Sequence, residues 1–93
     1  MDYNYPIDET WSKEEIIDVV NFFSLIEKAY EDKVKRDQLI ASYKRFKQIV
    51  PSKSEEKQHF ASFEKNSGYS SYRVVKEAKE TEHEFLSMNQ GTR

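Results

Sequence analysis

Two Glu-x-x-His pairs are the residues whose types and spacing come nearest to a metal-binding pattern. Glu56 and His59 form one pair, and Glu80 and His83 form the other. Residues three apart share a helix face, and carboxylate-bridged di-iron proteins combine two such pairs with one glutamate from each of two further helices. The first two helices expected here offer no glutamate that looks buried. Solvated surface residues are therefore the better interpretation, and we expect no metal or other cofactor.

A second candidate site is the stretch GYSSYRVVKEAKE, residues 68–80, which reads as a glycine turn, a serine cap and a helix. If Ser70 is the cap, Arg73 stands where the helix dipole favours a carboxylate. The simpler explanation is that Arg73 pairs with Glu77 or with an acid of the first helix. The alternative is that it joins the amides and hydroxyls of the helix start in binding a phosphate or a partner's carboxylate. The candidate anion- or partner-binding residues are Tyr69, Ser70, Ser71, Tyr72 and Arg73.

Basic side chains gather in one part of the chain. Residues 1–32 hold nine acids and two bases, whereas residues 33–53 hold seven bases and one acid. A cationic helix with aromatic side chains can follow a phosphate backbone, and the candidate basic surface comprises Arg36, Lys44, Arg45 and Lys47. However, the net charge of the whole chain is −2. The plainer interpretation is an acidic first helix that faces a basic second one, so nucleic acid is not the expected partner.

No other pattern of catalytic residues stands out, and we do not expect an enzyme. The sequence has no cysteine, which excludes disulfides, thiolate zinc sites and thiol nucleophiles. It has no Gly-x-Ser-x-Gly motif, and its two glycines are too few for a phosphate-binding loop. The serines cluster where helices are expected to start, and capping explains them there.

Four helices are expected to position these residues. Ser12 and Glu15 form a capping box that starts the first helix, which ends near Asp32. The second helix begins near Lys35, and Pro51 stops it. Because the intervening connection is short, the two helices should be antiparallel neighbours.

The third and fourth helices should form a second antiparallel pair. The third starts after Ser52 and runs to about Asn66, and Gly68 suits the left-handed position that closes it. The fourth starts after Ser70 and is expected to continue through residues 85–86.

An extended arm, residues 1–11, should precede the helices. Pro6 disfavours helical angles at the residue before it, and apolar and polar residues alternate around it. The aromatic side of the arm is expected to pack on a helical core over residues 12–88, and residues 89–93 are expected to be a flexible tail. The predicted core residues are Trp11, Ile16, Val20, Phe23, Ile26, Tyr30, Leu39, Tyr43, Phe46, Phe60, Phe63, Tyr72 and Val75.

Composition indicates one compact all-α domain spanning residues 1–93. The chain is 37% hydrophobic and 34% charged, with two prolines and thirteen aromatic residues, which suffice for one core. Its acidic start lacks the basic-then-apolar order of a signal peptide. The most apolar segment is eleven residues long and is interrupted by Asp18 and Asn21, so no membrane span is expected. We expect a cytoplasmic protein.

Several longer motifs resemble a known family. The segments are YNYP, W-S-x-E-E-I-I-D-V-V-N-F-F, YKRFKQIVPSKSEEKQ and GYSSYRVVKEAK. Together they resemble the uncharacterised protein family 0223, the YktA-like proteins of low-GC Gram-positive bacteria, over a region from Tyr3 to about Lys79. The resemblance implies a compact, all-helical cytoplasmic domain. It implies no activity, cofactor or catalytic residue.

The expected function is that of a non-enzymatic accessory module that binds another protein. Aromatic residues exceed what a small helical core needs, and exposed Tyr and Trp side chains are favoured interface anchors. Self-association is one version, because a third helix with few apolar residues would leave Phe60 or Phe63 partly uncovered. The alternative is anion or nucleic-acid binding through the basic second helix and the helix start at residues 70–73.

Overall fold

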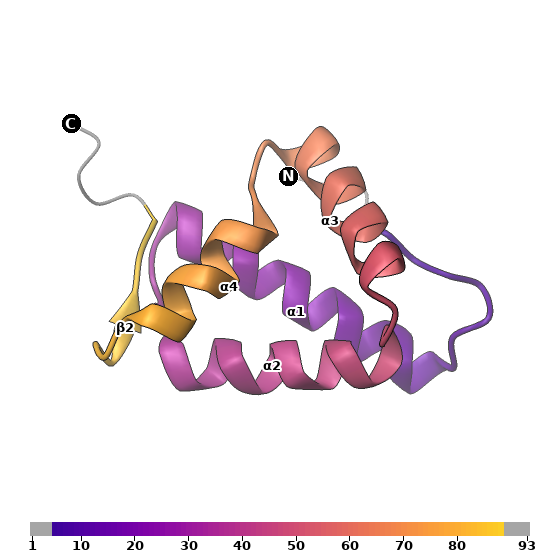
Figure 1. Cartoon of the computed structure of the whole chain (residues 1–93), viewed down its shortest axis with the longest axis horizontal. Coiled ribbons are helices and arrows are strands. Elements are labelled where there is room, and N and C mark those ends of the chain that lie inside the picture. The colour runs from indigo at the N-terminus through magenta and orange to yellow at the C-terminus, as the bar shows by residue number, and fades with distance from the viewer. Residues whose placement is uncertain (1–4, 89–93) are drawn as a thin grey trace.

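A computed structural model of the chain describes residues 5–88 and confirms the all-α class (Figure 1). Four helices carry the fold, and the only strands among these residues are two residues long. The elements are α1 (Lys13–Glu31), β1 (Val34–Lys35), α2 (Arg36–Ile49), α3 (Lys53–Ser67), α4 (Ser71–Glu80) and β2 (Phe85–Leu86). The first four residues of the predicted arm and the predicted tail, residues 89–93, lie outside the described residues.

Local capping chemistry sets the helix boundaries, as predicted. The Ser12 Oγ accepts the Glu15 N–H (3.1 Å), and the Ser12 N–H donates to Glu15 Oε1 (2.9 Å), which completes the capping box of α1. Ser52 accepts from the backbone of the third residue of α3 in the same manner. Gly68 closes α3 with φ +83°, a left-handed angle that glycine adopts at little cost.

The core surrounds α1, which packs against the other three helices. The rings of Phe22 and Phe46 lie 5.0 Å apart, and those of Phe23 and Phe63 lie 4.7 Å apart. Aromatic contacts of this kind add to the area that each ring buries. In Figure 1, α1 and α2 lie side by side and run in opposite directions, as predicted. The prediction that α3 and α4 form a second antiparallel pair is wrong, because the two helices diverge after Gly68.

The third helix is covered although its apolar face is narrow. Phe60 is 9% exposed and Phe63 is fully buried. Both side chains contact α1, so the expectation that one of them is partly uncovered, which motivated self-association, is wrong. Much of the predicted core is buried or half-buried, including Trp11 and Tyr30, which pack against the buried cluster.

Tyr72 was predicted to be a core residue, and that prediction is wrong. Its side chain is 63% exposed. The buried face of α4 instead consists of Ser71, Val74, Val75 and Ala78. Tyr72 lies in the first turn of α4, outside this buried face.

The predicted extension of the fourth helix through residues 85–86 is also wrong. The helix ends at Glu80, and β2 pairs antiparallel with β1, with Val34 opposite Leu86. The Met88 N–H then donates to the Ala29 carbonyl (2.7 Å), in the last turn of α1. This arrangement gives the Ala29 carbonyl at the end of α1 a hydrogen-bond partner, which it would lack if residues 85–88 continued α4 as a helix. It also buries Leu86.

The described part of the arm packs on the helices, as predicted. The Tyr5 ring lies 6.0 Å from Phe63 and 6.4 Å from Phe23, in stacked orientations. Its hydroxyl donates to Glu27 Oε1 (2.7 Å). Trp11 continues the contact further along, where its ring meets that of His59 (5.4 Å).

Candidate functional site

A groove between α3 and α4 brings together several of the candidate residues. It encloses about 590 Å³, and Tyr43 of α2 contributes to its lining at one end. Apolar and aromatic side chains from both helices contribute to its lining: Phe60 and Ala61 from α3, and Tyr72 and Val75 from α4. The volume falls in the range of ordinary ligand sites.

The groove exists because the start of α4 is held against α1. The rings of Tyr30 and Tyr69 are stacked 4.6 Å apart, and the Tyr69 hydroxyl donates to Glu31 Oε2 (2.8 Å). The Tyr30 hydroxyl accepts the Ser70 N–H (3.2 Å) and donates to the Ser70 carbonyl (3.3 Å). These contacts fix the first turn of α4 on α1 after the turn at Gly68, so α4 leaves α3 instead of packing along it.

A hydrogen-bonded cluster closes the end of the groove near α2. The Tyr43 hydroxyl donates to Glu56 Oε2 (2.8 Å), and the Lys47 ammonium donates to Glu56 Oε1 (2.6 Å). The Lys79 ammonium lies 5.1 Å from the centre of the Tyr43 ring. Burial, together with the hydrogen bond to the Glu56 carboxylate, raises the pKa of Tyr43 to about 12. Both oxygens of Glu56 are therefore engaged in joining α2 to α3.

The five candidate residues at the start of α4 divide into two groups. Ser70, Ser71 and Tyr72 line the groove, whereas Tyr69 packs on α1 and Arg73 is exposed outside it. The Ser70 Oγ accepts the Arg73 N–H (3.2 Å), which confirms Ser70 as the cap. The Arg73 guanidinium forms no ion pair with Glu77, or with any other acid of residues 5–88. The expected structural pairing is thus not seen.

Ser71 stands out within this group because it is buried. It is 1% exposed, and its Oγ has no hydrogen-bond partner among the described residues. A buried hydroxyl without a partner costs free energy.

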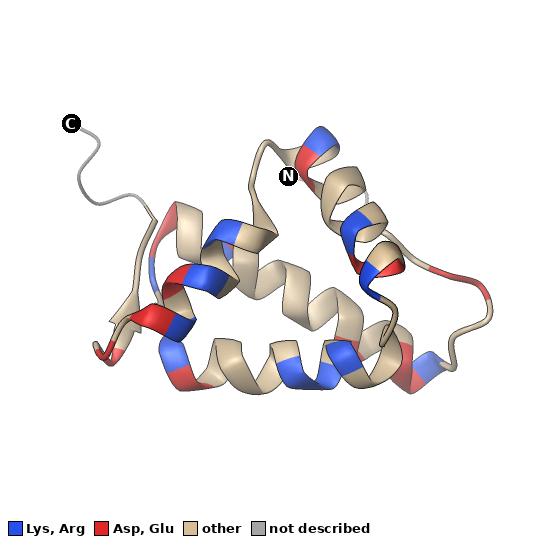
Figure 2. Ribbon diagram, in the orientation of Figure 1, with Lys and Arg blue, Asp and Glu red and all other residues tan. Residues whose placement is uncertain are grey.

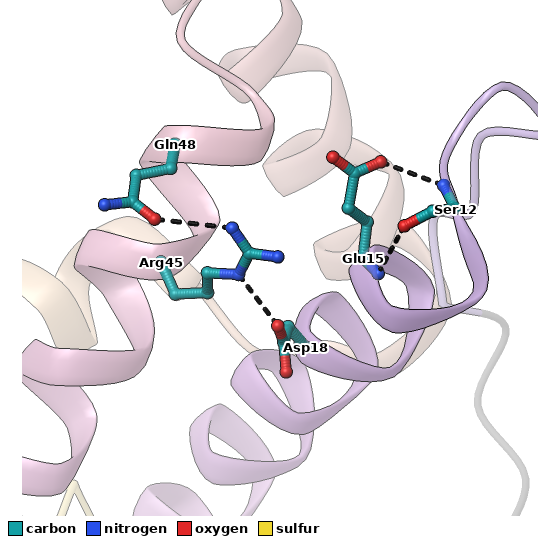
Figure 3. Close-up of polar contacts among 5 residues, drawn as sticks. All are labelled: Ser12, Glu15, Asp18, Arg45 and Gln48. Atoms are coloured by element: carbon teal, nitrogen blue, oxygen red, sulfur yellow. Dashed lines mark hydrogen bonds and ion pairs between the residues drawn. The ribbon is translucent and has the colours of Figure 1, made fainter.

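The four basic candidates of α2 do not form one free surface. Figure 2 shows basic residues at the start and in the second half of this helix, with acidic residues close to them. Arg45 Nε donates to Asp18 Oδ2 of α1 (2.7 Å), and Arg45 Nη1 donates to Gln48 Oε1 (3.3 Å) (Figure 3). Lys47 pairs with Glu56, as described above.

Arg36 is occupied as well, because its Nε donates to the Ala78 carbonyl (2.7 Å). Lys44 is the exposed member of the set. The contact between Arg45 and Asp18 agrees with the interpretation that the acidic first helix faces the basic second one. A nucleic-acid surface on α2 would have to compete with these internal contacts.

The Glu-x-x-His pairs are not assembled into a site. Glu56 is engaged by α2, and His59 packs on aromatic rings. Glu80 is the last residue of α4, so His83 lies beyond the helix and the helical spacing no longer applies. No cluster of three or more His, Asp or Glu residues within residues 5–88 is arranged to hold a metal ion.

Sequence reasoning did not bring the lysines of the groove together as one set. Lys53 and Lys57 on α3 and Lys76 and Lys79 on α4 all line it. On each helix the two lysines are three or four positions apart and next to the apolar lining, so the spacing alone was a signal. The sequence alone does not show that these two helix faces line the same groove.

A comparison with known proteins places the chain in a family. A model of the Uncharacterised protein family (UPF0223) matches residues 2–87. The chain belongs to this family. A UPF0223 protein of Oceanobacillus iheyensis is 67% identical over 88 residues, which cover 95% of this chain and all of the relative. The UPF0223 protein of Bacillus pumilus is 57% identical over 86 residues, covering 92% of this chain and 97% of the relative.

A UPF0223 protein of Streptococcus uberis is 55% identical over 86 residues, covering 92% of this chain and 94% of the relative. These matches confirm the resemblance seen in the sequence. The residues that match the UPF0223 model include all of α3 and α4, so the groove lies within the matched region. No helix of residues 5–88 has the length and apolar character that crossing a membrane requires.

Proposed function

We propose that this UPF0223 protein is a non-enzymatic, cytoplasmic interaction module that binds a segment of another protein in the groove between α3 and α4. The observation that carries the proposal is Tyr72. This large side chain is 63% exposed on the wall of an apolar groove, and no helix covers it. Tyrosine is a favoured interface anchor, because it offers a large rigid surface with a polar end.

The chemistry of the groove supports binding over catalysis. Glu56 has both carboxylate oxygens engaged, and Tyr43, with a pKa of about 12, is a poor acid–base group near neutral pH. The remaining lining is apolar or carries lysines, glutamates and two serines; the Ser70 hydroxyl caps α4, and the Ser71 hydroxyl is buried without a base beside it among the described residues. The absence of cysteine from the sequence agrees with a cytoplasmic location.

The test uses two exposed apolar side chains, one in the groove and one outside it. Tyr72 lies in the groove, and Ile17, which is 55% exposed on α1, does not line it. A photo-crosslinking amino acid placed at either position in cells should capture a defined protein from position 72 and not from position 17. The captured protein is then purified, and its binding is measured by calorimetry.

We expect Tyr72→Ala to weaken that binding at least about tenfold, the effect of removing a typical interface anchor. Ile17→Ala should leave the affinity unchanged, and both variants should keep the melting temperature within a few degrees. Equal capture from both positions, or binding that survives Tyr72→Ala, would contradict the proposal. Capture of a second copy of this chain, confirmed by sedimentation as a dimer, would replace the partner with the protein itself.

A further inference from the structure

The two walls of the groove carry four lysines that no acid within residues 5–88 pairs with. Lys53 and Lys57 come from α3, and Lys76 and Lys79 come from α4. All four are exposed, and none forms an ion pair with an acid of residues 5–88. Figure 2 shows basic residues on both of these helices.

The glutamates of the groove do not balance these lysines. Three glutamates line it, and Glu56 is already paired with Lys47 of α2. The other two, Glu64 and Glu80, belong to the last parts of α3 and α4. Four ammonium groups therefore face two free carboxylates, and the groove is left with a positive excess.

The apolar and basic parts of the groove follow one another along its length. Tyr72 lies in the first turn of α4, and Lys76 and Lys79 follow one and two turns later on the same helix. Lys79 reaches the Tyr43 ring, which marks the end of the groove near α2. A segment lying in the groove would thus meet an apolar anchor at the Tyr72 end and, toward α2, an excess of lysines over the one free carboxylate there, that of Glu80.

From this arrangement we infer that the occupant is an acidic segment of the partner protein, with an apolar side chain beside Tyr72 and carboxylates on the lysines nearer α2. The inference rests on the proposed function and adds the chemistry of the partner. Charge complementarity of this kind selects partners and their orientation. A phosphate backbone fits less well, because the groove lining includes apolar side chains and two free glutamates.

The experiment selects peptides from a random library displayed on phage, with the purified full chain as bait and Tyr72→Ala as the counter-selection. We expect the selected peptides to be rich in Asp and Glu near one Leu, Phe or Trp. Synthetic copies should bind more weakly as salt rises. The double charge reversal Lys57→Glu with Lys76→Glu should weaken them at least about tenfold.

A matched control separates the groove from net charge. Lys28→Glu with Lys65→Glu makes the same change in charge at exposed lysines outside the groove, and should alter the affinity much less. Neutral or basic peptides that depend on Tyr72 but not on the lysines would overturn the inference and leave the proposed function standing. A library that yields no Tyr72-dependent peptide would count against both. A single-stranded oligonucleotide that binds as tightly, with the same lysine dependence, would replace the acidic peptide and overturn the inference.

Discussion

Substitution by alanine should change the free energy of unfolding in opposite directions at two neighbouring serines at the start of α4. The Ser70 Oγ accepts the Arg73 N–H at 3.2 Å, so Ser70→Ala removes the cap of the helix. Loss of such a cap costs about 1 kcal/mol. The backbone of Ser70 should stay in place in the variant, because the Tyr30 hydroxyl bonds both its N–H and its carbonyl.

Ser71 should behave in the opposite way. Its Oγ is buried without a partner among the described residues, and such a group costs about 1–3 kcal/mol. Alanine removes that cost and favours the helix by up to about 0.5 kcal/mol, while it leaves a small gap. We expect Ser71→Ala to raise the free energy of unfolding by about 1 kcal/mol.

Urea and thermal unfolding, followed by circular dichroism, measure both changes. For a chain of this size, 1 kcal/mol corresponds to a shift of about 4–8 °C in the melting temperature. Ser70→Asp, which keeps a capping oxygen, should preserve most of the stability and serves as the control. If Ser71→Ala lowers stability as much as Ser70→Ala does, the Ser71 hydroxyl has a partner, such as an ordered water, and the reasoning is refuted.

Two further predictions concern carboxylates. Glu56→Gln should lower the free energy of unfolding by about 1–3 kcal/mol, because the half-buried Lys47 loses its counter-charge. In a Tyr43→Phe background the same substitution should cost less, because Tyr43 no longer donates to Glu56. Additive losses in this double-mutant cycle would contradict a shared cluster. Burial raises the pKa of Glu27 above 4.5, although the Tyr5 hydroxyl partly opposes this. The Glu27 carboxyl therefore binds its proton more tightly in the native state than in the unfolded chain. As a result, the contribution of Glu27 to stability falls as pH rises from below 4.5 through the raised pKa. Relative to the wild type, Glu27→Gln should gain stability between acidic and neutral pH; parallel pH profiles for the two proteins would show that Glu27 is not shifted.

The features that the sequence predicted well depend on neighbouring residues. The caps at Ser12, Ser52 and Ser70 and the left-handed turn at Gly68 each involve atoms a few residues apart, so the local sequence contains the whole interaction. The stop of the second helix before Pro51 has the same origin.

The features that were missed depend on distant residues. Residues 85–86 follow a helix and look like its continuation, but β1, their pairing partner, lies between α1 and α2. Tyr72 lies one helical turn before Val75, but Val75 is buried and Tyr72 is exposed, and which of these positions is covered depends on the direction of α3. That direction follows from the contact of Tyr30 with Tyr69, which no periodicity reveals. The groove therefore could not be assembled from the sequence, although each of its residues could be placed on a helix.

The pairing of β2 with β1 also orders events in time. The Ser87 hydroxyl donates to the Asp32 carbonyl across a separation of 55 residues, and the Met88 N–H donates to the Ala29 carbonyl beside it. These partners do not exist until residues 87–88 have been translated, so the Ala29 and Asp32 carbonyls at the end of α1 cannot form these bonds earlier. Closing so long a loop carries an entropic cost. The opening helix of the chain is thus completed by some of the last described residues to be synthesised.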